Sequence, residues 1–490
     1  MSLLTSPRAP GAGDALTSRQ RTTILVTCCL SLFIVGIDIF AVNVALPSIR
    51  TELGASPSQL QWVIDAYTLV IASLLMLGGS LGDRLGRKRV FQTGLLIFGV
   101  ASVLCSLAPT PEALIAGRML QAVGGAMLNP VALSIITNVF TDPKERARAI
   151  GLWGIAMGVS MALGPVIGGL SVTTIGWEAI FWLNVPVCLL AIVLTARFVP
   201  ESRADRARRF DPGGQLLIFV FLATLTLALI EGREWGWDSG RTIGCFAISA
   251  VALVLLVIWE ARHPEPMIDL RFFRSVPFSG AIASAVIVFG GTAGFLFLNT
   301  LYLQQARGMT ALEAGLMTLP LAAVSGVAAP MAGRLIASHG TRLPMTIGGI
   351  SMAVSGVLLM GVDNATSLWS LGLIYGVLGI GWGLLNVPIT NAAVSGMPRA
   401  QAGLASAMTS SGRQVGTALG VAVFGTIAFS RVDGPLGEGL AEASRPAWVI
   451  LAICGVVITV LTVVVTTGWA QRTAMQTRRR ITGTDDDAHW

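Results

Sequence analysis

Two aspartates lie inside long apolar segments of this sequence. Asp38 stands in Ile37-Asp38-Ile39-Phe40, about 8 residues or roughly 12 Å of helix from the end of its segment. Asp65 stands in the next segment, roughly 8 Å from its end. A carboxylate in apolar surroundings is costly unless a proton, a cation or water neutralises it. The pair therefore predicts proton or cation binding, with mutual repulsion splitting the two roles. The alternative for Asp65 is an interfacial acid hydrated by outer water.

One arginine accompanies these acids in a third apolar segment. Arg118 and Gln121 are three residues apart, so a helix presents both on one face. A buried arginine must face polar partners and not lipid. The alternative is an interfacial anchor, because Arg118 lies only about 7 residues inside its segment.

The segments that must position these residues are membrane helices. The chain has 490 residues, of which 53% are hydrophobic and 12% charged, whereas soluble domains carry about 25% charge. Fourteen apolar runs approach the roughly 20 residues that cross a bilayer. They are expected at 23–46, 60–81, 90–108, 112–138, 149–171, 179–197, 213–231, 242–260, 277–303, 312–333, 344–362, 367–392, 401–429 and 446–469.

Basic residues indicate the orientation of these helices. With the N-terminus inside, 25 of the 33 Lys and Arg residues fall in cytoplasmic segments and six in outer loops. This asymmetry follows the positive-inside rule, so both termini are expected in the cytoplasm and the protein in the inner, or plasma, membrane. The tail after Trp469 is expected to form a cap of Arg478, Arg479 and Arg480 at the membrane surface, followed by a solvated acidic end, Asp485 to Asp487.

An internal repeat divides the chain. Gly79 and Gly86 match Gly333 and Gly340 with the same spacing of seven, although Asp83 meets an alanine. We therefore expect an all-α membrane protein of two six-helix bundles with an inserted pair of helices. Its parts are a cytoplasmic tail at 1–21, a bundle at 22–198, an inner loop and helix pair at 199–265, a second bundle at 266–470 and a tail at 471–490.

Two glycine motifs stand at helix ends. The first closes one segment and opens the next, with glycines for a tight reversal and charges that keep the loop inside; its key residues are Gly79, Asp83, Arg84, Gly86 and Arg87. It predicts a gating latch or, more simply, an inside loop. In the second motif proline removes a helix hydrogen bond and glycines let helices touch, which by itself indicates packing; it contains Gly164, Pro165, Gly168 and Gly169.

Together these motifs resemble the major facilitator superfamily, and in particular its fourteen-span drug:proton antiporter family, over about residues 22–470. The resemblance implies that Asp83 and Arg87 help to hold the outward-open state, and that the second glycine motif separates exporters from symporters. It also implies that Arg118 tunes the proton affinity of a carboxylate. Acids at Asp38 and Asp65 are similar to those of quaternary ammonium exporters, which favours lipophilic cations as cargo.

Other polar and aromatic residues are candidates for the cavity wall. Cation–π contact would suit a flat lipophilic cation, although packing is the alternative for each aromatic; the candidates are Phe40, Asn43, Tyr67, Gln121 and Trp153. In the second half, Arg413, Gln414, Asn386 and Asn391 bond helices together or contact substrate. No acid lies clearly within the last six segments, which disfavours bulky dications.

Other functional classes lack their signatures. No Walker loop, catalytic constellation or metal-ligand spacing is visible, and the six cysteines lie in apolar runs. We expect no enzyme activity, no cofactor, no metal and no nucleic acid, a proton gradient as the energy source and a monomer in lipid.

The predicted function is proton-coupled export of lipophilic, cationic drugs or antibiotics by alternating access. A dedicated exporter of one antibiotic or metabolite would look the same. A substrate:proton symporter and a non-transporting sensor are the further alternatives.

Overall fold

Long helices make up this chain, as a computed structural model shows. The structure describes residues 16–203, 211–263, 266–395, 397, 401–432 and 436–482. Within them thirteen helices are long and apolar enough to cross a membrane. A further long helix, α14, brings the long helices of the described part to the expected fourteen.

The first half comprises six helices, and the inserted pair follows it. Their bounds are α1 Ser18–Leu53, α2 Pro57–Leu85, α3 Arg87–Ser106, α4 Pro111–Val139, α5 Pro143–Thr174, α6 Glu178–Phe198, α7 Pro212–Trp235 and α8 Gly240–Arg262.

The second half begins with a short 3-10 helix, and three of its described spans are each divided between two elements. Its elements are η1 Leu270–Arg274, α9 Val276–Leu301, η2 Tyr302–Ala306, α10 Ala311–Met317, α11 Leu319–His339, α12 Arg342–Met360, α13 Leu368–Val394, α14 Ala402–Phe429, α15 Leu436–Ala443, α16 Arg445–Val465 and α17 Gly468–Thr482.

Local sequence starts several of these helices in the same way. A side chain that accepts a hydrogen bond from the first turn precedes a proline at the first helical position, where no amide hydrogen is needed. This pattern occurs at Ser56-Pro57, Thr110-Pro111, Asp142-Pro143 and Asp211-Pro212. Each helix therefore begins at a residue pair that is readable in the sequence.

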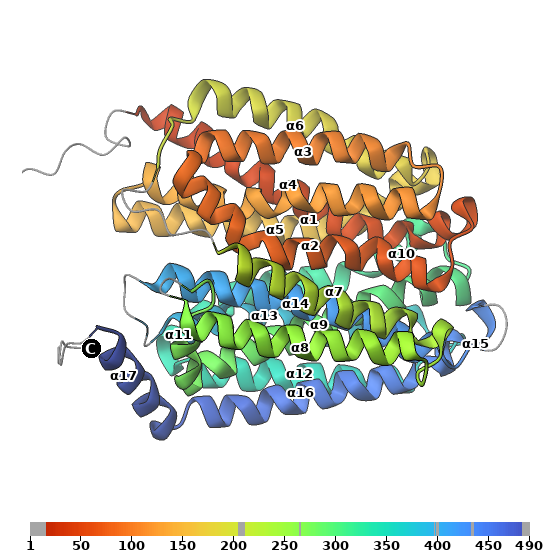
Figure 1. Cartoon of the computed structure of the whole chain (residues 1–490). Helices are drawn as coiled ribbons and strands as arrows, with labels where there is room; N and C mark the ends of the chain where they lie inside the picture. The colour runs from red at the N-terminus through yellow and green to blue at the C-terminus, as the bar shows by residue number, and fades with distance from the viewer. Residues whose placement is uncertain are drawn as a thin grey trace, which may run out of the picture.

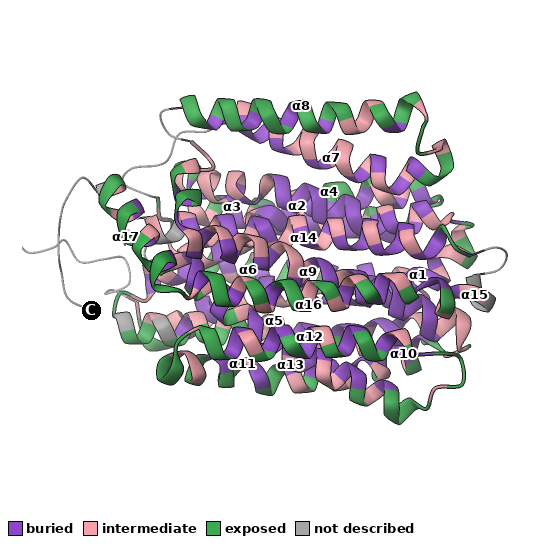
Figure 2. Ribbon diagram, turned by 90° about the horizontal axis from the view of Figure 1, so that it is seen from below, coloured by how far each residue is buried: buried purple, intermediate pink, exposed green. Residues whose placement is uncertain are grey.

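The helices form two bundles with the inserted pair on one side. Helices α1–α6 pack together, as do α9–α14 with α16, and α7 lies against α2 of the first half and α14 of the second (Figure 1). Helix α8 packs mainly on α7 and presents a largely exposed face (Figure 2). The inserted pair thus touches both halves at one seam.

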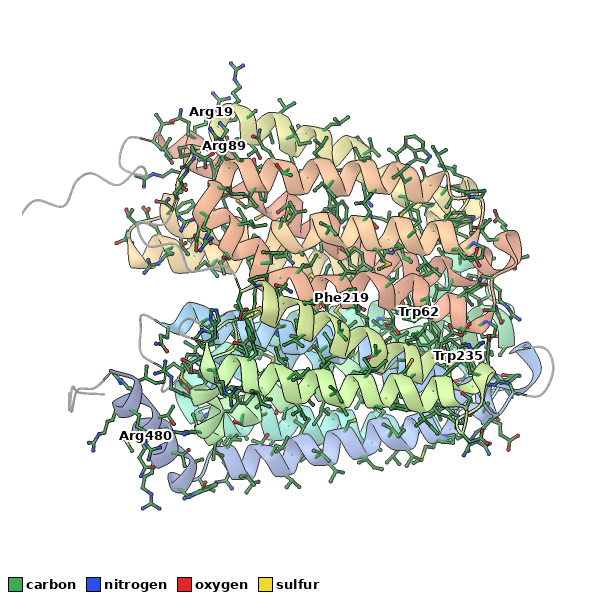
Figure 3. All side chains as sticks on the ribbon, in the orientation of Figure 1. Arg19, Trp62, Arg89, Phe219, Trp235 and Arg480 are labelled. Atoms are coloured by element: carbon green, nitrogen blue, oxygen red, sulfur yellow. The ribbon has the colours of Figure 1, made fainter. Side chains whose placement is uncertain are left out.

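Arginines mark one end of the helices. Figure 3 shows Arg19, Arg89 and Arg480 at this end, which we call the inner end, with Trp62 and Trp235 toward the opposite, outer end. Helix α17 lies at the inner end, where Thr473 accepts a hydrogen bond from the backbone amide of Val276 at 3.0 Å. The basic part of the tail, Arg478 to Arg480, therefore belongs to a helix that packs on the second half at the inner end. The expected acidic end, Asp485 to Asp487, lies outside the described residues.

The two halves make close contact toward the outer end. Gln61 of α2 donates to the carbonyls of Val421 and Ala422 in α14, each at 3.1 Å. Gln304 donates to the carbonyl of Val44 at 2.7 Å, and Arg50 to Gln305 at 3.0 Å. These bonds join α1 and α2 to the second half.

The inner part of α5 is open by contrast. Of residues 151–159 six are exposed, and the other three, Trp153, Ala156 and Met157, are half-buried on the side that packs on the first half. A side chain added at Gly151, Gly154 or Gly158, on the exposed sides, would meet no atom of the described residues within 4 Å. The contacts between the halves described above lie toward the outer end, and this inner stretch of α5 is exposed on its remaining sides. The arrangement is therefore closed at the outer end and open at the inner end.

Candidate functional site

Asp38 is the centre of a buried polar cluster in the first half. Its side chain is fully buried and forms an ion pair with Arg118 of α4. It also accepts hydrogen bonds from Gln121 at 2.8 Å and from Asn184 of α6 at 3.0 Å. Ser102 of α3 accepts hydrogen bonds from both amides, so four helices contribute to this cluster: α1, α3, α4 and α6. The carboxylate therefore has a cation and two amide donors inside an apolar bundle.

Arg118 is held as firmly as the aspartate. Its Nε donates to the carbonyl of Val63 at 3.2 Å, and its guanidinium lies 4.1 Å from the ring centre of Tyr67. Gln121 accepts from Arg118 and in turn donates to Ser102 at 2.8 Å. Arg118 is thus a counter-ion buried within the bundle, and the interfacial-anchor alternative does not describe its position.

Asp65 has a different environment. Its side chain is fully buried, and neither carboxylate oxygen has a hydrogen-bond partner in the described part of the chain. It lies four residues, about one helical turn, inward from Gln61 on the same face of α2. That face is the one through which Gln61 contacts α14. Asp38 is therefore neutralised by the protein, whereas Asp65, at the seam between the halves, has no hydrogen-bond partner among the described residues.

The candidate cavity residues lie in several environments. Gln121 belongs to the Asp38 cluster. Tyr67 packs on Arg118, and its hydroxyl has no hydrogen-bond partner among the described residues. Phe40 is buried in the core, Asn43 donates to the carbonyl of Ile39 at 2.9 Å, and Trp153 is half-buried on the inner part of α5. Of the five, Trp153 lies on the largely exposed inner stretch of α5, on the side that packs on the first half.

The first glycine motif is bonded to the end of α6 and the segment that follows it. Asp83 and Arg87 form an ion pair at 2.9 Å, and the amide of Arg87 donates to the carbonyl of Ser202 at 2.9 Å. Gly86 has a φ of 109°, and a side chain there would meet the Glu201 carboxylate, so the turn requires glycine.

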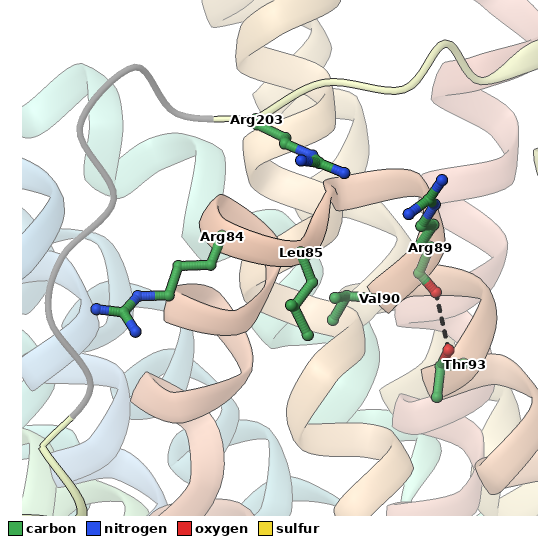
Figure 4. Close-up of a pocket in the computed structure, with 6 residues that line it drawn as sticks. All are labelled: Arg84, Leu85, Arg89, Val90, Thr93 and Arg203. Carbon is green, nitrogen blue, oxygen red and sulfur yellow. Dashed lines mark hydrogen bonds between the residues drawn. The ribbon is translucent and has the colours of Figure 1, made fainter.

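Figure 4 shows that Arg84, Arg89 and Arg203 surround a small surface pocket beside this loop, also lined by Leu85, Val90 and Thr93. The loop is a cationic, charge-paired structure at the inner end. Gly79 lies one helical turn before it on α2, against Pro130 of α4.

The second glycine motif makes contact on two sides of α5. A side chain at Gly164 would lie 2.7 Å from Phe40 of α1, and one at Gly168 would lie 2.8 Å from Ala41. On the other side, a side chain at Gly169 would lie 2.5 Å from the carbonyl oxygen of Ala311 in α10, and Gly315 approaches the backbone of Pro165. The motif therefore packs within the first half and also against the second half.

Two residues of the Asp38 cluster were not proposed as site residues from the sequence. Ser102 and Asn184 are polar residues within apolar segments, and that is the signal that could have indicated them, because buried amides and hydroxyls bond across membrane helices. Their local sequence does not indicate Asp38 as the partner, because Asn184 lies 146 residues from Asp38 in the chain.

Comparisons with known proteins agree with this architecture. The chain matches the Major Facilitator Superfamily over residues 28–421. It is 36% identical over 428 residues to the multidrug resistance protein Stp of Mycobacterium tuberculosis, covering 87% of this chain and 79% of that protein. It is also 36% identical to the tetracenomycin C resistance and export protein of Streptomyces glaucescens, covering 89% and 81%.

A solved structure supports the fold. The bacterial homolog of the human lysosomal transporter spinster, solved inward-facing and unoccupied, aligns with a TM-score of 0.66 at 19% identity. The alignment covers 94% of this chain and 99% of that one. Motifs, helix arrangement and sequence relatives agree, and the chain belongs to the Major Facilitator Superfamily.

Proposed function

We propose that this chain exports small lipophilic molecules across the plasma membrane in exchange for protons. The observation that carries the coupling is the contrast between the two buried acids: Asp38 is paired with Arg118, and Asp65 has no hydrogen-bond partner among the described residues. The relatives are named for multidrug resistance and for resistance to and export of tetracenomycin C. These names favour drugs or antibiotics as the cargo.

Asp65 is the proton-carrying group of this proposal. An ionised carboxylate without partners is costly in a dry interior, whereas a protonated one is tolerated. Asp65 gives up its proton when the inward-open cleft admits water, and a cationic cargo or a new proton must neutralise it before the protein can close. Asp38, fixed by Arg118, Gln121 and Asn184, supplies a permanent counter-charge that keeps α1, α4 and α6 together.

Protonation then drives the exchange. On the outward-facing side, protons bind Asp65 and displace the cargo, and the neutral site returns through the closed state. The proposal requires the proton gradient as its energy source and no cofactor. It places both termini in the cytoplasm, because the inner end carries the arginines, and treats the monomer as the transporting unit.

Proton release from energised everted vesicles tests the proposal. The probes are cationic dyes such as ethidium, a quaternary ammonium biocide and neutral antibiotics. Wild type is expected to release protons when a transported probe is added, and Asp65→Asn to abolish that release because asparagine cannot titrate. Asp238→Asn, which removes an exposed acid between α7 and α8, is the matched control and is expected to behave as wild type.

Two results would overturn the proposal. One is proton release that persists unchanged in Asp65→Asn and in Asp38→Asn plus Asp65→Asn. The other is a wild-type protein that neither releases protons nor lowers drug susceptibility across the whole panel in an efflux-deficient host. The same susceptibility profile separates a broad exporter from a dedicated one.

A further inference from the structure

Arg413 is a cation in the second half that has no acidic partner among the residues the structure describes. Its guanidinium donates to Thr390 of α13 and, at 3.4 Å, to the carbonyl of Asn386, and both acceptors are neutral. Its Nε is buried and has no hydrogen-bond partner in the described part of the chain. Arg118 in the first half, by contrast, is paired with Asp38. The second half therefore presents an uncompensated positive charge.

Two aromatic side chains lie beside this guanidinium. The ring centre of Phe289 in α9 is 5.2 Å from the Arg413 guanidinium carbon. Trp382 of α13 packs on Phe289 with ring centres 4.5 Å apart and an interplanar angle of 58°. Both aromatics are half-buried, so part of each ring is free to meet another molecule. A cation and aromatic faces from three helices thus converge at one place.

The residues around Arg413 are partly exposed. Arg413 belongs to a stripe of partly exposed polar residues on α14 with helical spacing i, i+3, i+4 and i+7, namely Ser410, Arg413, Gln414 and Thr417. A polar stripe with a charge is costly against lipid and is stable against water. Asn386 and Thr390, which Arg413 contacts, are also partly exposed. The stripe therefore faces a hydrated space.

We propose that Arg413, Phe289 and Trp382 form a docking site for the acidic group of a planar aromatic cargo. The guanidinium fork is suited to a carboxylate or phenolate oxygen, and the aromatic faces to the attached ring. This site rests on the proposed export function and adds a second substrate class, acidic aromatic molecules, to the cationic cargo that would neutralise Asp65. It also gives the second half a role in recognition that needs no acid of its own: the cargo supplies the missing negative charge.

Binding of two xanthene dyes of opposite charge tests the site. Fluorescein carries acidic groups, whereas a cationic rhodamine ester has the same ring system without them. Fluorescence anisotropy with the purified full-length protein is expected to show that wild type binds fluorescein. Arg413→Gln is expected to weaken fluorescein binding at least tenfold and to leave rhodamine binding within twofold of wild type. Arg413→Lys keeps the positive charge but not the forked guanidinium, so it should lose less fluorescein affinity than Arg413→Gln.

The matched control is Arg241→Gln, which removes an exposed arginine at the start of α8 and should leave both affinities unchanged. Two results would overturn the site. One is that Arg413→Gln and Arg413→Lys weaken the binding of both dyes equally, and the other is that wild type does not bind fluorescein. If Arg413→Gln does not fold, Arg413→Lys carries the same comparison.

Failure of this site is distinguishable from failure of the export proposal. Asp65→Asn should abolish proton release while fluorescein binding persists. The wild type could release protons on addition of drug while the Arg413 variants change the binding of both dyes equally. This result would support export and reject the docking site.

Discussion

Buried charges in this protein differ chiefly in whether they have partners. Asp38 and Arg118 neutralise one another and are further bonded by Gln121 and Asn184, so the cluster is satisfied and rigid. Within the part of the chain that the structure describes, Asp65 has no hydrogen-bond partner, and Arg413 has neutral partners only. Satisfied charges suit a structural role, whereas unsatisfied ones suit groups that bind protons or cargo.

The Asp38–Arg118 pair makes a stability prediction. Arg118→Met leaves Asp38 buried without its counter-ion and should destabilise the folded protein by about 3–5 kcal/mol, since breaking a buried pair costs that much. Asp38→Asn plus Arg118→Met removes both charges and should recover most of the loss. Thermal unfolding of the purified variants in detergent measures both. Unfolding of the single variant at the wild-type temperature would contradict the prediction.

Among the elements, α5 and α7 connect the two halves. Helix α5 carries a glycine motif that packs on α1 from one side and on α10 from the other. Helix α7 is bonded to α2, where Trp62 donates to Glu231 at 2.8 Å, and to α14, where Thr426 donates to the carbonyl of Leu229 at 2.8 Å. The inserted pair thus covers the α2–α14 seam beside Asp65.

Gly169 tests the role of the glycine motif. A methyl group there would lie 2.5 Å from the carbonyl oxygen of Ala311, so Gly169→Ala should push α10 away and favour an open outer end. We expect about a tenfold shift, equivalent to about 1.4 kcal/mol, with a matching fall in ethidium efflux. A maleimide that cannot cross the membrane should label Gln305→Cys faster from outside, in a background without the six native cysteines.

Gly151→Ala is the matched control for this change. It adds the same methyl group to the same helix where nothing lies within 4 Å, and it should leave efflux and labelling as in wild type. Equal behaviour of the two alanine variants would show that the α5–α10 contact does not limit opening.

At the scale of the whole molecule, the two halves touch at the outer end and separate at the inner end. The bonds from Gln61 to α14 and from Gln304 to α1 close the outer side. The inner part of α5 is exposed except on the side that packs on the first half. Alternating access requires these outer contacts to break while the inner helix ends approach one another.

A cross-link across the outer contact should therefore stop transport. Gln61→Cys and Gly425→Cys, placed where Gln61 approaches α14, are expected to react with a short bis-maleimide and to abolish efflux. The control joins two helices of the first half: Gly99→Cys with the native Cys188, whose Cβ lies 3.3 Å from the Cβ position at 99. This second link should leave efflux intact. Full efflux with the outer link formed would exclude separation of the halves there.

The sequence by itself determined the class of this protein and the positions of its helices. Hydropathy is a local property, since each stretch of about 20 apolar residues must cross lipid whatever its neighbours do. Proline and capping side chains likewise act on the helix that they begin. For the same reason the loop and glycine motifs, and the buried acids, were readable without coordinates.

Only the tertiary structure decided which charges are neutralised. Asp38 contacts Arg118, 80 residues away in the chain, and Asn184, 146 residues away. Asp65 has no hydrogen-bond partner in the described part of the chain, although the sequence places both acids in similar apolar segments. Nor did the sequence show that Gly169 faces α10 or that α7 spans the seam. These contacts depend on how separate helices pack, and a linear pattern specifies which residues can be buried but not which residues they meet.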